Sequence, residues 1–112
     1  MSTTNAFSPN GNTIAFTANT SAPTPVQASN YELAGMAGQY RVINAGTNTV
    51  FLGVGNSSAN ATANAQVVST SGPSIPLLPG TDEILSFGFN AYFTGITSSG
   101  TSQVYITPGN GI

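Results

Sequence analysis

Hydrophobic and polar residues alternate along most of this chain, in short runs separated by turn-forming residues. The clearest run is 12–18, where Ile14 and Phe16 alternate with threonine and alanine. Alternation with a period of two is typical of a strand that buries one face, and clusters of Gly, Pro and Asn between such runs are typical of turns. The pattern predicts eight or nine short strands. The expected ranges are 12–18, 25–28, 39–44, 49–54, 65–69, 75–78, 82–89, 92–97 and 103–107.

Helical periodicity is nearly absent, because thirteen Gly and seven Pro interrupt any stripe with a 3.6-residue period. A single turn over 31–36 is the one helical candidate. Short strands spaced about 8 to 12 residues apart are typical of sandwiches and barrels. We therefore predict one all-β domain over 1–112, a β-sandwich or jelly roll of about eight short antiparallel strands, with 1–9 and 109–112 as flexible tails or arms. Pro76 lies within an apolar run, which indicates an edge strand or a bulge.

The chain also contains an internal similarity. Residues 46–56 (GTNTVFLGVGN) align without gaps on residues 100–110 (GTSQVYITPGN), about half the chain further on. Each block follows an apolar run and a turn that contains glycine. One interpretation is a duplicated hairpin in the two halves of a jelly roll. The other is that unrelated hairpins have similar residues in any chain rich in Gly, Thr and Val. Both interpretations predict a hairpin at each block.

Composition then removes whole classes of function. Charged residues make up 4% of the chain, against about 25% in an average soluble domain, and Lys, His, Cys and Trp are absent. A single Arg cannot neutralise a phosphate backbone or an anionic membrane surface, so we expect no nucleic-acid partner and no membrane partner. Without His, Cys or Lys there is no imidazole base, thiolate nucleophile or tetrahedral zinc site. We expect no enzyme activity, no catalytic residues, no metal and no cofactor. The N-terminal sequence, without a basic or an apolar region, predicts no signal peptide.

The few charged side chains are the remaining candidates for specific contacts. Asp82 and Glu83 are adjacent, and adjacent strand residues point to opposite faces, so they are not expected to act as a catalytic pair. We expect Asp82 to cap a turn at the entrance of its strand. An unpaired buried guanidinium is very costly, so Arg41 is expected to be exposed or paired with Glu32, Glu83 or a neighbouring subunit. Arg41, Glu32 and Glu83 are therefore the candidate structural or interface residues.

Three segments, taken together, resemble a known class of protein. They are YRVINAGTNTVFLG (40–53), IPLLPGTDEIL (75–85) and TSQVYITPG (101–109), which follow a polar, charge-poor N-terminal part. In this the chain resembles the small virion proteins of tailed bacteriophages that decorate or cement the capsid. The resemblance implies a β-sandwich or jelly-roll subunit that binds the major capsid protein on the capsid surface after assembly in the host cytoplasm. It also implies a homo-oligomer, with a trimer favoured.

A second function stays open beside this one: a carbohydrate- or receptor-binding module of a phage fibre, tail or neck. The arrangement of exposed apolar side chains separates the two. Exposed Tyr or Phe gathered in one cleft would favour the binding module. Apolar surface spread over two patches, one for self-association and one for a partner, would favour the decoration protein.

Overall fold

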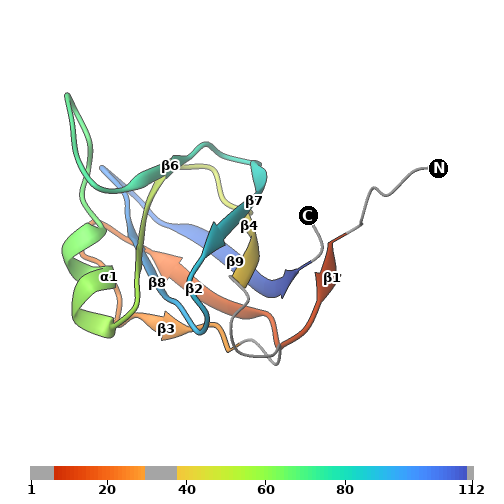
Figure 1. Cartoon of the computed structure of the whole chain (residues 1–112). Coiled ribbons are helices and arrows are strands. Elements are labelled where there is room, and N and C mark those ends of the chain that lie inside the picture. Colours follow the sequence, from red (N-terminus) through yellow and green to blue (C-terminus); the bar gives the residue numbers. More distant parts are fainter. Residues whose placement is uncertain (1–6, 30–37, 111–112) are drawn as a thin grey trace.

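Two antiparallel sheets pack face to face to form the body of the protein (Figure 1). The computed structural model describes residues 7–29 and 38–110, and these hold nine strands and one short helix. The elements are β1 (Ser8–Pro9), β2 (Ile14–Ala18), β3 (Val26–Gln27), β4 (Gly38–Asn44), β5 (Val50–Gly55), α1 (Ser58–Asn64), β6 (Ile75–Leu77), β7 (Asp82–Phe87), β8 (Tyr92–Ile96) and β9 (Ser102–Asn110).

The strand order is that of a jelly roll. One sheet has the order β2-β9-β4-β7, with β1 beside the far end of β9, and the other has the order β3-β8-β5-β6. Strands of the first half pair antiparallel with strands of the second half: β2 with β9, β3 with β8, β4 with β7 and β5 with β6. This is the pairing of one long hairpin rolled into two sheets. The predicted all-β sandwich or jelly roll is therefore confirmed.

The two halves of the chain take equivalent places in this topology. If each of the strands β2 to β5 is exchanged with the strand four places further on, the order of one sheet becomes the order of the other, read in reverse. The similar blocks 46–56 and 100–110 thus occupy corresponding positions, each beginning in a connection between the two sheets. The predicted hairpins are wrong, because β4 and β5 lie in different sheets, as do β8 and β9. Instead, the connection after β4 packs closely against the start of β9: a Cβ on Gly46 would collide with the side chain of Ser102.

Alternating side chains along the strands build the core between the sheets. In β4, Tyr40 and Val42 are fully buried, whereas Arg41 between them is exposed. The rings of Tyr40 and Phe93 meet edge to face, with their centroids 4.9 Å apart. Each aliphatic or aromatic side chain buried in this way contributes roughly 1.5–3 kcal/mol to folding. The alternation seen in the sequence is thus the alternation of core and surface.

Eight of the nine predicted strands are present, with ends that differ by up to three residues. Pro76 lies in an edge strand, as expected, because β6 ends its sheet. The predicted strand at 65–69 is wrong: this segment follows α1 as irregular chain. The helical candidate at 31–36 lies outside the described residues.

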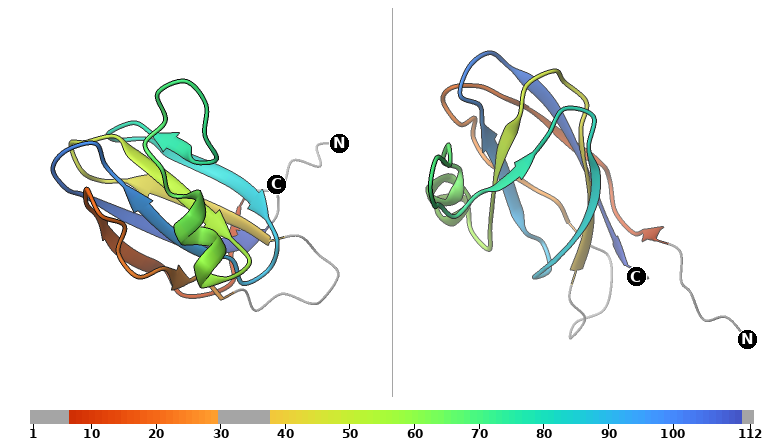
Figure 2. Two further views of the ribbon diagram at one scale, coloured as in Figure 1. Left: turned by 90° about the vertical axis from the view of Figure 1, so that its left-hand side faces the viewer. Right: turned by 90° about the horizontal axis from the view of Figure 1, so that it is seen from above.

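Helix α1 was not anticipated, and its position depends on glycine. Ser57 caps its first turn by accepting a hydrogen bond from the backbone N–H of Asn60 at 3.2 Å. The helix lies against β5, where a Cβ on Gly53 would collide with the carbonyl oxygen of Ala61 (Figure 2). Ala61 is fully buried at this contact. Close packing of small residues, rather than an apolar stripe, holds the helix in place.

The chain ends were expected to be tails, but part of each lies in a sheet. Ser8 pairs with Asn110 and Pro9 with Gly109, so β1 is bound to the end of β9. Residues 1–6 and 111–112 lie outside the described residues.

A buried asparagine holds the corner where the chain leaves β4. The side chain of Asn44 is fully buried, and its NH₂ group donates to the carbonyl oxygens of Asn48 and Leu77 at 2.9 and 2.8 Å. Its Oδ1 accepts from the backbone N–H of Gly46 at 3.1 Å and from the hydroxyl of Ser102 at 2.8 Å. Both donors and both acceptor positions of the amide are therefore used.

Replacing that amide by a carboxylate of the same shape tests the corner. Asn44→Asp puts an oxygen against the carbonyls of Asn48 and Leu77 and buries a charge, so we expect the free energy of unfolding at pH 7 to fall by at least about 3 kcal/mol. Burial raises the pKa of the new carboxyl, so the loss should shrink as the pH falls toward 4. Urea denaturation measures both effects. In the control Asn19→Asp, the residue is exposed and its side-chain oxygen accepts from the N–H of Thr20, a bond that a carboxylate can also accept, so the change should stay within about 0.5 kcal/mol. Equal losses in the two variants would contradict the role of Asn44.

Candidate functional site

Arg41 forms an ion pair with Asp82, a partner that the sequence did not predict. Its Nε donates to Asp82 Oδ1 at 2.9 Å and its Nη2 to Oδ2 at 2.5 Å, a two-point contact across neighbouring strands. The register places Ile43 opposite Asp82, so Arg41 reaches its partner diagonally on the outer face of the sheet. Both side chains are about half exposed. Arg41 is exposed, which was one of the expected alternatives, and its partner is Asp82 rather than Glu83. Asp82 binds this guanidinium with both carboxylate oxygens instead of capping the turn, as was expected.

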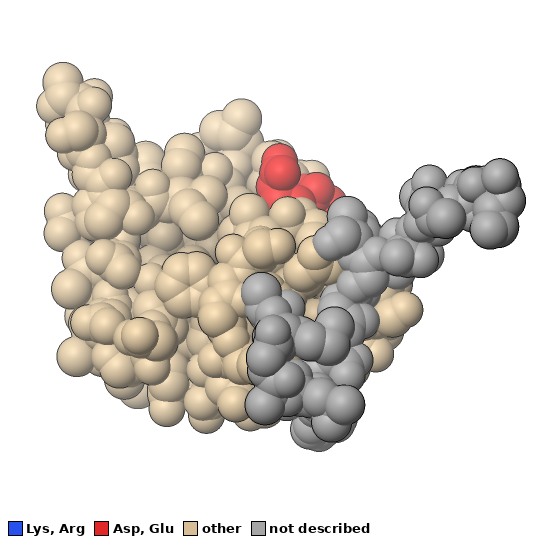
Figure 3. All heavy atoms as spheres, in the orientation of Figure 1, with Lys and Arg blue, Asp and Glu red and all other residues tan. Residues whose placement is uncertain are grey.

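Glu83 lies on the other face of the same strand. It stands opposite Val42, whose side chain is in the core, yet Glu83 is exposed because β7 runs along the margin of the sandwich. Figure 3 shows acidic side chains in one place near β7, and the other described residues visible on that face are uncharged. Glu32 lies outside the described residues. Of the two candidates that the structure describes, Arg41 and Glu83, it thus brings Arg41 into an ion pair, and with Asp82.

Exposed apolar side chains form a first patch on the outer face of the sheet that contains β4. Tyr105 of β9 stands opposite Ile43, and Ile84 of β7 stands opposite Arg41. Tyr105 is 41% exposed and Ile84 is 38% exposed. We call Ile43, Ile84 and Tyr105 the sheet-face patch. The Arg41–Asp82 ion pair lies among these residues.

A second group of exposed apolar side chains lies along β6 and β7. These two strands are at the margins of the two sheets, and Figure 2 shows their ribbons. Leu78 is 59% exposed, Phe87 is 39% exposed and Ile75 is 37% exposed. The register turns Phe87 and Ile75 toward the interior, because their strand partners Gly38 and Leu52 are buried. They remain accessible because β6 is only three residues long and does not cover the space beside β7. We call Ile75, Leu78 and Phe87 the margin patch.

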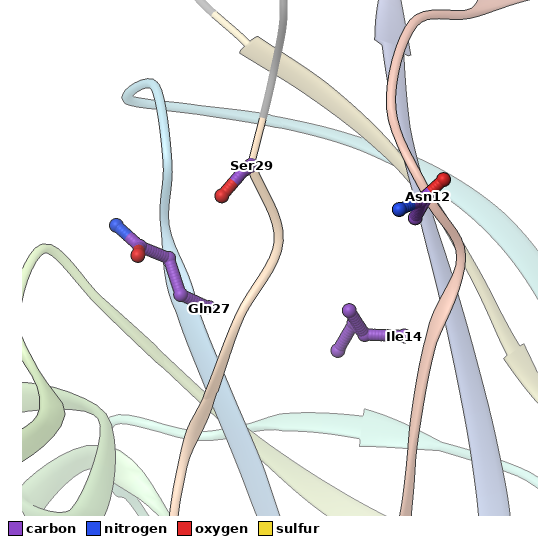
Figure 4. Close-up of a pocket in the computed structure, with 4 residues that line it drawn as sticks. All are labelled: Asn12, Ile14, Gln27 and Ser29. Atoms are coloured by element: carbon purple, nitrogen blue, oxygen red, sulfur yellow. The ribbon is translucent and has the colours of Figure 1, made fainter.

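A small polar pocket lies on the opposite side of the sandwich. It measures about 300 Å³ and is lined by Asn12 and Ile14 from the chain at β2 and by Gln27 and Ser29 from the chain at β3 (Figure 4). The side chain of Gln27 donates to the carbonyl oxygen of Asn90 at 3.0 Å. None of these four lining residues is aromatic, and the exposed aromatic residues Phe87 and Tyr105 lie elsewhere.

Residues 7–29 and 38–110 contain no cluster of acidic residues that could hold a metal ion. In the same part of the chain, no helix has the length and hydropathy needed to span a bilayer. No protein-family model, curated protein or solved structure matches this chain.

Three groups have shifted pKa values. The hydrogen bonds and charge of Arg41 hold the pKa of the Asp82 carboxyl below its usual range, and Asp82 in turn raises the pKa of Arg41. Burial raises the pKa of the Tyr40 phenol, and the N–H of Ala91, which donates to the phenol oxygen at 3.1 Å, opposes this to a smaller extent. The same phenol donates to the carbonyl oxygen of Gly88 at 2.6 Å. The shifts of Asp82 and Tyr40 act at opposite ends of the pH scale.

We expect the melting temperature to be nearly constant from pH 5 to pH 9. The chain has no His, and only the N-terminal amine has an ordinary pKa in this window. The lowered pKa of Asp82 contributes stability above its usual value of about 4, which is lost as the pH falls through the folded value. The raised pKa of Tyr40 contributes stability below about pH 10, which is lost as the pH rises further. Calorimetry from pH 3 to pH 11 measures the profile.

Two variants test which residues cause the loss of stability at acid and at alkaline pH. Tyr40→Phe should reduce the alkaline fall and also lower stability at pH 7 by roughly 1–3 kcal/mol, because the buried N–H of Ala91 loses its acceptor. Arg41→Ala should reduce the acid fall. A change above about 10 °C between pH 5 and pH 9 would contradict the low proton exchange on which the expectation depends.

Proposed function

We propose that this protein is a structural virion subunit of the capsid decoration or cement type, which oligomerises and stabilises a phage head by binding the major capsid protein. The observation that carries the proposal is the distribution of exposed apolar side chains. Of the six large apolar side chains that are exposed in residues 7–29 and 38–110, five lie in two places, the sheet-face patch and the margin patch, and the sixth is Val67, in the irregular chain after α1. Two separate apolar patches suit a subunit that contacts its own copies through one and a different protein through the other.

The sparse charge supports the same function. The ion pair neutralises Asp82, which leaves Glu83 as the single unpaired charged side chain in residues 7–29 and 38–110. A surface of this kind gives little electrostatic repulsion between copies. A subunit that binds a shell in many copies also needs only modest affinity at each contact, because the contacts act together.

The fold itself does not choose between the candidate functions. Jelly rolls occur in viral capsid proteins and also in lectins. A carbohydrate- or receptor-binding module of a fibre, tail or neck remains the second candidate, and the polar pocket beside β2 and β3 is the observation that favours it. Amides and hydroxyls there could bind a sugar, but the four lining residues offer no aromatic ring for a sugar to stack on.

Co-sedimentation with purified phage heads that lack their decoration protein tests the proposal. We expect the chain to sediment with the heads and to raise the temperature at which they rupture. Tyr105→Lys, in the sheet-face patch, should weaken binding at least tenfold, because it places a charge in an apolar contact. The matched control Thr62→Lys adds the same charge at an exposed position of α1, away from both patches, and should bind like the parent chain.

A glycan-binding assay on the same preparation tests the second candidate, the carbohydrate-binding module. A chain that ignores the heads but binds a glycan, and loses that binding in Gln27→Ala, would overturn the proposal and establish the second candidate.

A further inference from the structure

Strand β7 leaves one row of backbone groups directed away from its neighbour β4. The N–H of Asn44 donates to the carbonyl oxygen of Thr81 at 3.0 Å, so these opposed residues belong to a hydrogen-bonded position of the ladder. Such positions alternate along antiparallel strands. Glu83 and Leu85 therefore turn their backbone groups toward β4. The N–H and C=O groups of Asp82, Ile84 and Ser86 point outward at the sheet edge.

The other sheet margins carry features that discourage pairing with a further strand. β1 is two residues long and contains Pro9, and β6 is three residues long and contains Pro76. β3 is two residues long and follows Pro25. Short edge strands and proline are common means of blocking edge-to-edge association. β2 contacts β3 and β8, so the sandwich is closed on that side.

β7 is different from these margins. It is six residues long, has no proline, and carries the exposed apolar side chains of Ile84 and Phe87. Of its two acidic residues, Asp82 is already paired with Arg41. An exposed apolar edge strand without blocking residues is a template for another strand.

We infer that the partner of this edge is β7 of a second copy, paired antiparallel about a twofold axis through Ile84. This inference rests on the proposed function and changes one part of it: self-association falls on the β7 edge, at Ile84 of the sheet-face patch, and Tyr105 of the same patch is left for a different protein. In this register Ile84 lies opposite its own copy and Asp82 lies opposite Ser86, so all three outward-facing residues form hydrogen bonds. Glu83 lies opposite Leu85. No like charges face each other, and the apolar Ile84 side chains meet at the centre.

The twofold contact closes on itself. It joins the two sheets that contain β4 into one continuous sheet and leaves Tyr105, two strands away from the axis in each copy, free for another protein. It differs from the trimer that the resemblance to decoration proteins implies, because a strand edge that pairs antiparallel with itself makes a dimer.

Disulfide trapping tests the register directly, because the natural chain has no cysteine. Residues opposed at a hydrogen-bonded position have Cα atoms about 5.5 Å apart, within the range that a disulfide spans. Ile84→Cys should therefore give a covalent dimer on mild oxidation. Tyr105→Cys, on the same face and similarly exposed, should stay largely monomeric on a non-reducing gel.

Sedimentation equilibrium of the full chain measures the mass without trapping. We expect twice the 11.3 kDa chain mass for the parent, and a dissociation constant at least tenfold higher for Ser86→Pro, which removes an outward N–H. Circular dichroism should show that this variant still folds, because proline is tolerated where the N–H faces away from the sheet. A monomer, a trimer, or equal trapping at positions 84 and 105 would overturn the inference. A monomeric parent chain that binds heads would contradict the dimer and still support the proposed function. A β7 dimer that does not bind heads would contradict the proposed function and still support the dimer.

Discussion

The fully used amide of Asn44 is the interaction on which the rest of the structure depends. Its four hydrogen bonds join the end of β4 to the following connection, to β6 in the opposite sheet and to the start of β9. An apolar side chain of this size would take a hydrogen-bond partner away from two carbonyls, one N–H and one hydroxyl. A carboxylate or an ammonium could satisfy only one half of them. Only an amide offers two donors and two acceptors at this place, so it fixes how the two sheets meet.

The same corner brings together equivalent positions of the two similar blocks. The backbone N–H of Asn48 approaches the hydroxyl of Ser102 at 3.4 Å, and these two positions are 54 residues apart, the offset at which 46–56 aligns on 100–110. Equivalent points of the two halves therefore touch where the two connections cross. The similarity reflects two corresponding corners of a rolled hairpin. A hairpin at each block, as expected from the sequence, would have paired β4 with β5 and β8 with β9, and neither pair forms.

The alternation of apolar and polar residues predicted most of the strands, because buried and exposed positions alternate along β2, β4 and β9. It failed at 65–69, where Val67 and Val68 follow a helix whose position depends on Gly53, a tertiary contact with no sequence period. It also could not name the partner of Arg41. Two adjacent acids differ only in the face they occupy, and the register that puts Asp82 on the face of Arg41 is set by pairing across strands distant in the chain. Asn44 gave no signal, since asparagine is common throughout this sequence.

Because this chain has few charged side chains, other features must protect its strand edges from association. In most soluble proteins, charged side chains keep copies apart and cover strand edges. Here that role falls to short strands and to Pro9, Pro25 and Pro76, which cost no ionisable group and act at any pH. Such protection is selective, because it blocks one edge and leaves another open, whereas a net charge repels every copy from all sides. An edge left open in a chain that blocks its others is therefore better understood as a contact surface than as an unguarded one, and the exposed isoleucine at its centre agrees with that interpretation.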